Sequence, residues 1–184
     1  METQINQARL AIKRFQNGYS GAILITGPRN SGKSGLSKII CQKILPNWEI
    51  IRIKPPKEGS SSTKVFHQFI KQSLNFNEAD FDIYLASLAS PRIIIINDLE
   101  LWWARNNNGH HVLKEIIRLI DKYGGKHLFI INSGTSAWNF ISKMHWPESS
   151  FLAHLKCQPL DARELRDLVM LRHKAGGLTF YLNS

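Results

Sequence analysis

The stretch Gly27–Ser34, G-P-R-N-S-G-K-S, constrains this chain more than any other, because it fits the pattern G-x-x-x-x-G-K-[ST]. It follows directly on the apolar run Ala22–Ile25, and an amphipathic segment follows it. Glycines at these positions let backbone N–H groups turn inward around phosphate oxygens, and the N-terminus of the next helix adds a positive dipole. The pattern therefore predicts a phosphate-binding P-loop between a strand and a helix.

The chemistry of such a loop predicts ATP and Mg²⁺ as ligands. Lys33 would reach the β- and γ-phosphates as a catalytic residue, and the Ser34 hydroxyl would ligate the Mg²⁺. The whole loop is expected to surround the nucleotide, so the predicted contacts are Gly27, Pro28, Arg29, Asn30, Ser31, Gly32, Lys33 and Ser34.

Composition excludes several other classes of protein. At 184 residues with 43% hydrophobic side chains, the chain suits one soluble domain, and no apolar run approaches the length of a membrane span. With only Cys41 and Cys157, a disulfide framework is not expected, which favours a cytoplasmic setting. The formal charge of +10 is compatible with DNA or RNA as a partner. The basic residues are scattered, however, and a solvated basic surface is the preferred explanation of them.

Hydrophobic periodicity predicts strands that alternate with helices. The predicted strands are 21–26, 48–53, 92–97, 127–132 and 151–156; the predicted helices are 4–15, 33–45, 63–74, 79–89, 110–123, 136–144 and 161–173. Alternation of this kind indicates parallel β-α units, hence a three-layer α/β/α sandwich around a mainly parallel five-stranded sheet. Ligands of such folds bind at the carboxyl ends of the strands, where the P-loop lies.

A second signal lies where the isoleucine-rich strand 92–97 ends, because a carboxylate at such a strand tip is typical of a Walker B element. Two registers fit. In the first, Asp98 binds the metal with Ser34, and Glu100 polarises the attacking water. In the second, Asn97 occupies the metal position and Asp98 acts as a shorter base. The first is preferred, because a neutral Asn is a poor metal ligand.

A third signal is Asn132, at the end of the strand 127–132. A polar residue at the tip of the strand that lies between the P-loop strand and the Walker B strand can bond the γ-phosphate or orient the attacking water. Asn132 is therefore a predicted catalytic residue beside Lys33 and Glu100. A loop-capping asparagine is the alternative.

These motifs resemble the AAA+ ATPases and the related signal-transduction ATPases with numerous domains (STAND). The resemblance is carried by Gly27–Ser34, Ile93–Glu100, Phe129–Asn132 and Leu155–Leu165, the last being similar to the exit from a fifth strand into a helical lid. It implies a sheet in the order 5-1-4-3-2, a nucleotide-binding core over residues 1–160 and the start of a lid over 161–184. Because the family's lid normally continues further, a fragment of a longer protein is expected, with a protein that lacks the lid as the alternative.

The resemblance also implies a function. It implies Mg-dependent ATP hydrolysis, which the departures from an ideal Asp-Glu pair could slow, coupled to assembly or remodelling of a partner, with a homo-oligomer among the expected assemblies. An arginine finger would come from a neighbouring subunit, with Arg105, Arg163, Arg166 and Arg172 as candidates. The alternatives are a nucleotide-dependent switch or scaffold with little turnover and, less favoured, a small-molecule P-loop kinase.

Overall fold

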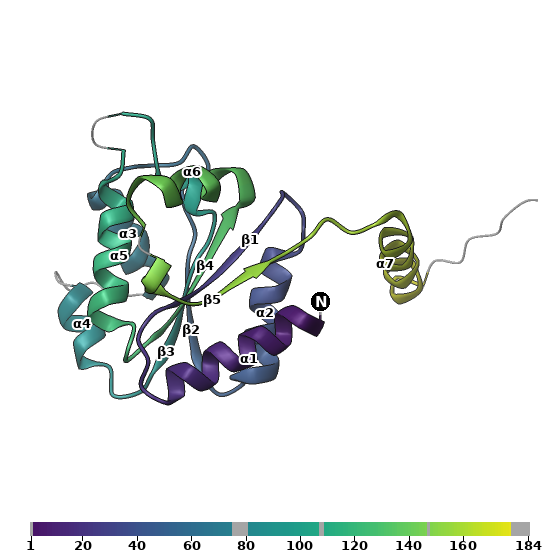
Figure 1. Cartoon of the computed structure of the whole chain (residues 1–184), viewed down its shortest axis with the longest axis horizontal. Coiled ribbons are helices and arrows are strands. Elements are labelled where there is room, and N and C mark those ends of the chain that lie inside the picture. The colour runs from purple at the N-terminus through teal and green to yellow at the C-terminus, as the bar shows by residue number, and fades with distance from the viewer. Residues whose placement is uncertain (1, 75–80, 107–108, 147, 178–184) are drawn as a thin grey trace, which may run out of the picture.

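The chain folds around a parallel five-stranded sheet (Figure 1). The structure is a computed structural model that describes residues 2–74, 81–106, 109–146 and 148–177. The sheet has the order β2-β3-β4-β1-β5, which confirms the predicted order 5-1-4-3-2. Its strands are β1 (Ala22–Gly27), β2 (Glu49–Ile53), β3 (Arg92–Ile96), β4 (Leu128–Gly134) and β5 (Phe151–Lys156).

Helices cover both faces of the sheet, so the predicted three-layer sandwich is confirmed (Figure 1). One face packs against α1 (Glu2–Gln16) and α2 (Lys33–Ile44). The other face packs against α3 (Thr63–Leu74), α4 (Phe81–Ser87), the 3₁₀-helix η1 (Leu99–Trp102), α5 (His111–Tyr123) and α6 (Thr135–His145). A short 3₁₀-helix η2 (Glu148–Ser150) precedes β5. The predicted helix 79–89 appears as α4, and its residues 79–80 lie outside the described part of the chain.

Strand β3 shows why the sheet is buried on both sides. Its four isoleucines are at most 1% exposed. Ile93 and Ile95 pack toward α1 and α2, whereas Ile94 and Ile96 pack toward α3 and α5. Successive side chains of a strand point to opposite faces, and a run of β-branched residues therefore suits a strand with a helical layer on each side.

The strand register brings the predicted site residues to one edge of the sheet. Ile25 pairs with Asn132 and Gly27 pairs with Gly134 between β1 and β4, and Ile96 pairs with Ile131 between β3 and β4. All pairs are parallel, so the C-terminal ends of the strands lie together. The P-loop, Asn97 and Asn132 consequently meet at this edge.

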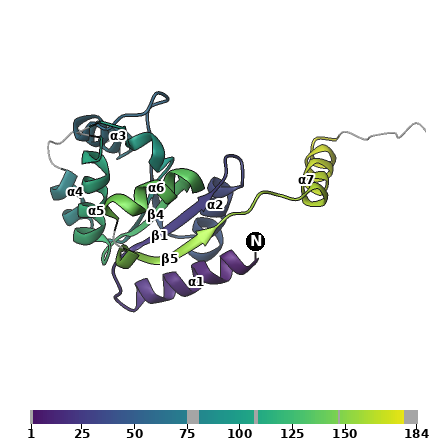
Figure 2. The ribbon, with the colours of Figure 1, turned by 45° about the horizontal axis from the view of Figure 1, so that its top comes forward.

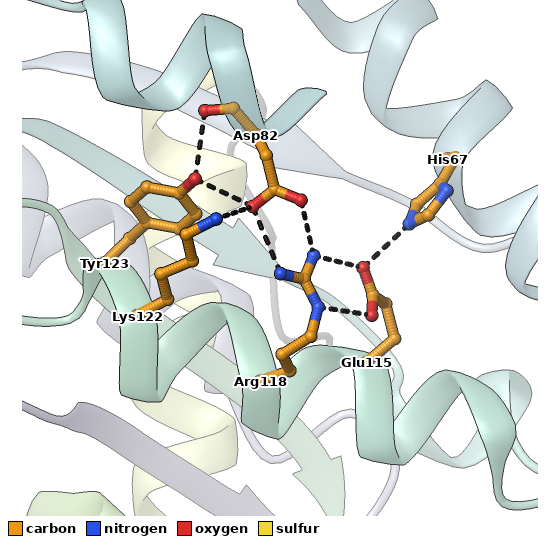
Figure 3. A network of polar contacts seen from close by, with 6 residues as sticks. All are labelled: His67, Asp82, Glu115, Arg118, Lys122 and Tyr123. Atoms are coloured by element: carbon orange, nitrogen blue, oxygen red, sulfur yellow. Dashed lines mark hydrogen bonds and ion pairs between the residues drawn. The ribbon is translucent and has the colours of Figure 1, made fainter. Parts of the chain in front are cut away.

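A network of charged side chains fastens α3 and α4 to α5 on one face (Figure 3). Arg118 lies at its centre, between the carboxylates of Asp82 and Glu115. His67 reaches Glu115 over 2.9 Å from α3, and the Tyr123 hydroxyl donates to Asp82 over 2.7 Å. These partners come from three helices, so the network holds their relative positions.

The last described helix, α7 (Ala162–Ala175), stands apart from the sheet at the end of an extended segment (Figure 2). Asp161 and Glu164 form a capping box at its N-terminus: Glu164 N donates to Asp161 Oδ1 over 2.7 Å, and Asp161 N donates to Glu164 Oε2 over 3.1 Å. None of its residues is buried. Across the described ranges, no helix has the length and apolar character needed to cross a membrane.

Candidate functional site

The backbone of the P-loop is shaped for an anion. Asn30 and Gly32 adopt left-handed conformations, with φ of 63° and 86°. Gly32 is the N-cap of α2 and provides no side-chain cap for the first turn of that helix. The first N–H groups of a helix have no partner within it, so an uncapped N-terminus is a ready site for phosphate. The geometry here matches the loop that the sequence predicted.

Glycine is required at the first position of the loop. A Cβ added to Gly27 would lie 2.8 Å from both the Cβ and the carbonyl oxygen of Cys157, and it would overlap Ser31 Oγ. The segment after β5 is held this close because Cys157 N donates to Thr26 O over 2.6 Å. The loop and the start of the connector to α7 therefore form one packed unit.

Lys33 curls back over the loop. Its Nζ donates to Gly27 O over 3.0 Å and to Pro28 O over 2.8 Å. Ser31 Oγ is buried and has no hydrogen-bond partner among the described residues. An ammonium over the loop, an unpartnered hydroxyl and the uncapped N-terminus of α2 together suit a group rich in acceptor oxygens. The residues present thus fit a polyphosphate.

Asp98 lies in the same charged neighbourhood as the loop. It follows β3 in a left-handed conformation, with φ of 48°. Partial loss of contact with water raises the pKa of its carboxyl, and repulsion from Glu100 raises it further, whereas Lys33 and Arg29 act in the opposite direction. Ser34 lies exposed in the first turn of α2. A hydroxyl and a carboxylate are oxygen donors of the kind that Mg²⁺ prefers, so these two residues fit the metal.

Glu100 is held at the end of β4. Its Oε2 accepts a hydrogen bond from Gly134 N over 3.0 Å and another from Ser133 Oγ over 3.3 Å. A Cβ on Gly134 would come within 3.1 Å of Glu100 Oε1, so the carboxylate packs directly against this glycine. The structure therefore places Glu100 against the strand that carries Asn132, while Asp98 is the carboxylate on which the positive charges of Lys33 and Arg29 act.

Asn132 is 1% exposed, and its amide is bonded within the protein. It accepts from Ser37 Oγ over 3.0 Å and donates to Asn97 Oδ1 over 2.8 Å. Sequence reasoning did not identify Ser37. The available signal was a serine beside Leu36 on the apolar face of α2, at a position that the structure finds fully buried.

The candidate arginine fingers occupy two places. Arg105 lies past η1, with its guanidinium 5.5 Å from the centre of the Phe140 ring. The other three are on α7, away from the P-loop (Figure 2): Arg163, Arg166 and Arg172. These positions do not identify which arginine would act as the finger.

The two adjacent tryptophans before Arg105 pack differently. Trp102 is fully buried, and Trp103 packs against Phe140 with ring centres 5.0 Å apart.

Solved structures share this fold at low sequence identity. The Pyrobaculum aerophilum CDC6P protein matches with a TM-score of 0.69 and 15% identity, over 95% of this chain and 49% of that one. The Aeropyrum pernix ORC1 protein in complex with DNA matches with a TM-score of 0.64 and 13% identity, over 95% of this chain and 49% of that one. The Aeropyrum pernix ORC2 protein, in ADPNP-ADP complexes, matches with a TM-score of 0.62 and 14% identity, over 94% of this chain and 51% of that one. This chain thus spans about half the length of these proteins.

A search of the curated proteins found no match. The family of ATPases associated with various cellular activities (AAA) matches residues 23–151. That range begins in β1 and extends into β5, and it includes the P-loop, Asp98, Glu100 and Asn132. The matched range covers most of the chain, and the fold and sheet order agree with it. The chain therefore belongs to the AAA family, whose P-loop nucleotide-binding core it contains.

Proposed function

We propose that this chain binds Mg-ATP, hydrolyses it, and couples the nucleotide state to assembly or remodelling of a larger partner. The observation that carries the proposal is the uncapped N-terminus of α2, which lies beside Lys33 at the sheet edge where Asp98 is found. The loop N–H groups and Lys33 would hold the phosphates, and Ser34 and Asp98 would hold the metal. Bound Mg²⁺ would neutralise charge on the phosphate oxygens.

In the preferred register, Glu100 would polarise the attacking water, with Asn132 two residues before the end of β4, the strand that Glu100 contacts at Gly134. The register in which Asn97 takes the metal position and Asp98 is the base remains a second proposal. The side-chain oxygen of Asn97, which would be the metal ligand in that register, accepts a hydrogen bond from Asn132. Separate substitution of Asp98 and Glu100 distinguishes the two registers.

A nucleotide-dependent switch with little turnover is the second candidate function. The supporting observation is the position of Glu100, whose carboxylate accepts hydrogen bonds from Gly134 N and Ser133 Oγ. Both bonds go to Oε2, and they hold the carboxylate against β4 and make that oxygen a poorer proton acceptor. Slow hydrolysis with tight nucleotide binding would favour this function over rapid turnover.

The partner is proposed to be a nucleic acid or further copies of this chain. One protein of similar fold, the ORC1 protein, was solved in complex with DNA, and this chain carries a formal charge of +10. A positive field of this size attracts polyanions over long distances. We also propose that α7 begins a helical lid, because it stands clear of the core and exposes Leu165, Val169 and Leu171.

The decisive experiment measures ATP affinity and phosphate release for the wild-type protein, Lys33→Ala and Lys38→Ala. Lys38 is an exposed lysine on the same helix and serves as the matched control. Lys33→Ala should lose about tenfold to a hundredfold in affinity, since hydrogen bonds to charged groups contribute about 1.5–3 kcal/mol. Unchanged ATP affinity in Lys33→Ala would contradict the P-loop assignment. Phosphate release with and without added DNA tests whether nucleic acid stimulates turnover.

A further inference from the structure

Three polar side chains form a continuous path from α2 to the ends of β4 and β3. Ser37 Oγ donates to Asn132 Oδ1 over 3.0 Å, and Asn132 Nδ2 donates to Asn97 Oδ1 over 2.8 Å. Ser37 is fully buried and Asn132 is 1% exposed, whereas Asn97 is partly exposed. The path therefore begins in the core and reaches solvent at Asn97.

Ser37 is a polar residue at a buried position of α2, where space alone does not require a hydroxyl. It lies one helical turn after Lys33, and its neighbours Leu36 and Ile40 are buried apolar residues. A buried hydroxyl is unfavourable unless it is hydrogen-bonded, and alanine would fit the same helix position without that requirement. Ser37 Oγ also lies 3.1 Å from Lys33 O, one turn earlier in its own helix, so its single hydrogen has two acceptors within reach. The bond to Asn132 Oδ1, at 3.0 Å, is the contact through which the serine reaches the strand ends.

The direction of these hydrogen bonds determines which end of the Asn97 side-chain amide is bonded to the protein and which is left unbonded. A carboxamide has an acceptor on one branch and a donor on the other. Because Ser37 donates to the oxygen of Asn132, the nitrogen of Asn132 faces the oxygen of Asn97. The NH₂ group of Asn97 is then the free branch, and no protein group in the described ranges accepts from it.

We propose that Ser37 is a positioning residue: acting through Asn132, it turns the Asn97 amide so that an N–H donor, rather than an oxygen, faces the nucleotide phosphates. This inference rests on the ATP site proposed above. Phosphate oxygens are strong acceptors for such a donor. A donor at this strand tip does not ligate a cation, so the metal is left to Ser34 and Asp98.

The first test compares the wild-type protein with Ser37→Ala and Ser37→Thr for ATP affinity and turnover number. Ser37→Ala should lower turnover or affinity by about tenfold, and Ser37→Thr, which keeps the hydroxyl, should recover most of that loss. Ser150→Ala is the matched control, because Ser150 is a buried serine before β5, outside the site. The control should leave both quantities unchanged whatever it does to stability.

A double-mutant cycle separates positioning from general destabilisation. If Ser37 acts through Asn132, then Ser37→Ala should have no further effect on turnover in an Asn132→Ala background. In nucleotide-free protein, Ser37→Ala should also shift the side-chain amide NMR signals of Asn97 and Asn132, whereas Ser150→Ala should not. Additive losses in the cycle, or unshifted amide signals, would overturn the inference.

A magnesium titration of Asn97→Ala tests which branch of the amide faces the site. Loss of a phosphate donor should weaken ATP binding by the same factor at every Mg²⁺ concentration. Loss of a metal ligand would instead raise the Mg²⁺ concentration needed for half-maximal binding, and that result would overturn the proposed orientation. Wild-type protein that binds no ATP would refute the proposed function. Normal wild-type binding together with an unaffected Ser37→Ala would refute only the positioning role.

Discussion

Arg118 binds the Asp82 carboxylate with both of its terminal nitrogens: Nη1 donates to Oδ1 over 3.1 Å and Nη2 to Oδ2 over 2.8 Å. The same guanidinium donates to Glu115 through Nε, over 2.7 Å. Figure 3 shows the guanidinium between the two carboxylates, with Tyr123 and Lys122 on the far side of Asp82. One arginine therefore joins α4 to α5 through a planar, two-bond contact, which is the strongest geometry available to an ion pair.

Replacement of Arg118 by alanine should lower the free energy of unfolding by about 1–2 kcal/mol. The side chain is 41% exposed, so water screens the pair and the full value of a buried ion pair does not apply. The loss still exceeds that of an isolated surface pair, because two carboxylates lose a bonded partner. Urea denaturation measures the change. Arg9→Ala, at an exposed position on α1, is the control and should alter stability by less than about 0.5 kcal/mol.

Acid should weaken the Asp82 contact in a defined pH range. Hydrogen bonds from Arg118, and secondarily from Tyr123 and Lys122, hold the pKa of Asp82 well below its usual value, despite partial burial. In the unfolded chain this carboxyl takes up a proton near pH 3.9, while in the folded chain it stays ionised to lower pH. The stabilisation is complete above that pH and is lost as the pH falls below it. The stability difference between wild type and Asp82→Asn should shrink from pH 6 to pH 3.

His127 predicts a second pH effect, nearer neutrality. The residue is fully buried, its Nδ1 accepts from Arg92 N over 3.2 Å, and its Nε2 lies 3.1 Å from Leu85 O. Both bonds suit a neutral ring with the proton on Nε2. Burial lowers its pKa, and nearby Lys126 and Arg92 lower it further.

The sign of the His127 effect is opposite to that of a histidine with an acidic partner. Below about pH 6.5 the unfolded chain binds a proton that the folded chain does not. Stability should therefore be complete above this pH and fall on acidification, by at most about 1.4 kcal/mol per pH unit, until the lowered folded pKa is reached. Thermal unfolding between pH 7.5 and 5.5 measures it. In a His127→Gln variant this dependence should flatten; an equally steep curve would contradict the assignment.

Gly27→Ala should disrupt the P-loop through a packing clash. The added methyl would meet Cys157 at 2.8 Å, at backbone as well as side-chain atoms, so neighbouring atoms cannot move aside without shifting the chain. We expect a loss of about 1–3 kcal/mol in stability, the usual cost of overpacking, together with weaker ATP binding. Gly35→Ala is the control, since a methyl at Gly35 meets no atom within 4 Å. ATP titration and urea denaturation of both variants give the comparison.

Separate substitution of Asp98 and Glu100 should identify the Walker B register. In the preferred register, Asp98→Asn raises the Mg²⁺ concentration needed for half-maximal turnover, because it removes a metal ligand. Glu100→Gln lowers the turnover number by about 10²–10⁴-fold without changing the Mg²⁺ requirement, since it removes a general base. The reverse result, with Asp98→Asn abolishing turnover and Glu100→Gln nearly silent, would support the register with Asn97 and Asp98.

Most of the architecture was predictable from sequence, because its signals are local. The isoleucine run of β3 indicated a buried interior strand, and the helix pattern of 63–74 agrees with α3 at both ends. The glycine spacing of 27–34 specified the loop, since phosphate-binding backbone geometry depends on consecutive residues. Strand ends were less well determined: β4 continues two residues beyond the predicted Asn132, to Gly134, which there meets Glu100.

The amino-acid sequence by itself determined the alternation of strands and helices, the P-loop and the polar residues at the strand tips, because each depends on neighbours within one segment. Only the tertiary structure decided which of these residues meet. Ser37 and Asn132 are 95 positions apart, and Glu100 and Gly134 are 34 apart. Their contacts depend on how α2, β4 and η1 pack at one sheet edge, and hydrogen bonds of 3.0 Å require that packing to be exact to a few tenths of an ångström. No periodicity along the chain encodes such a distance.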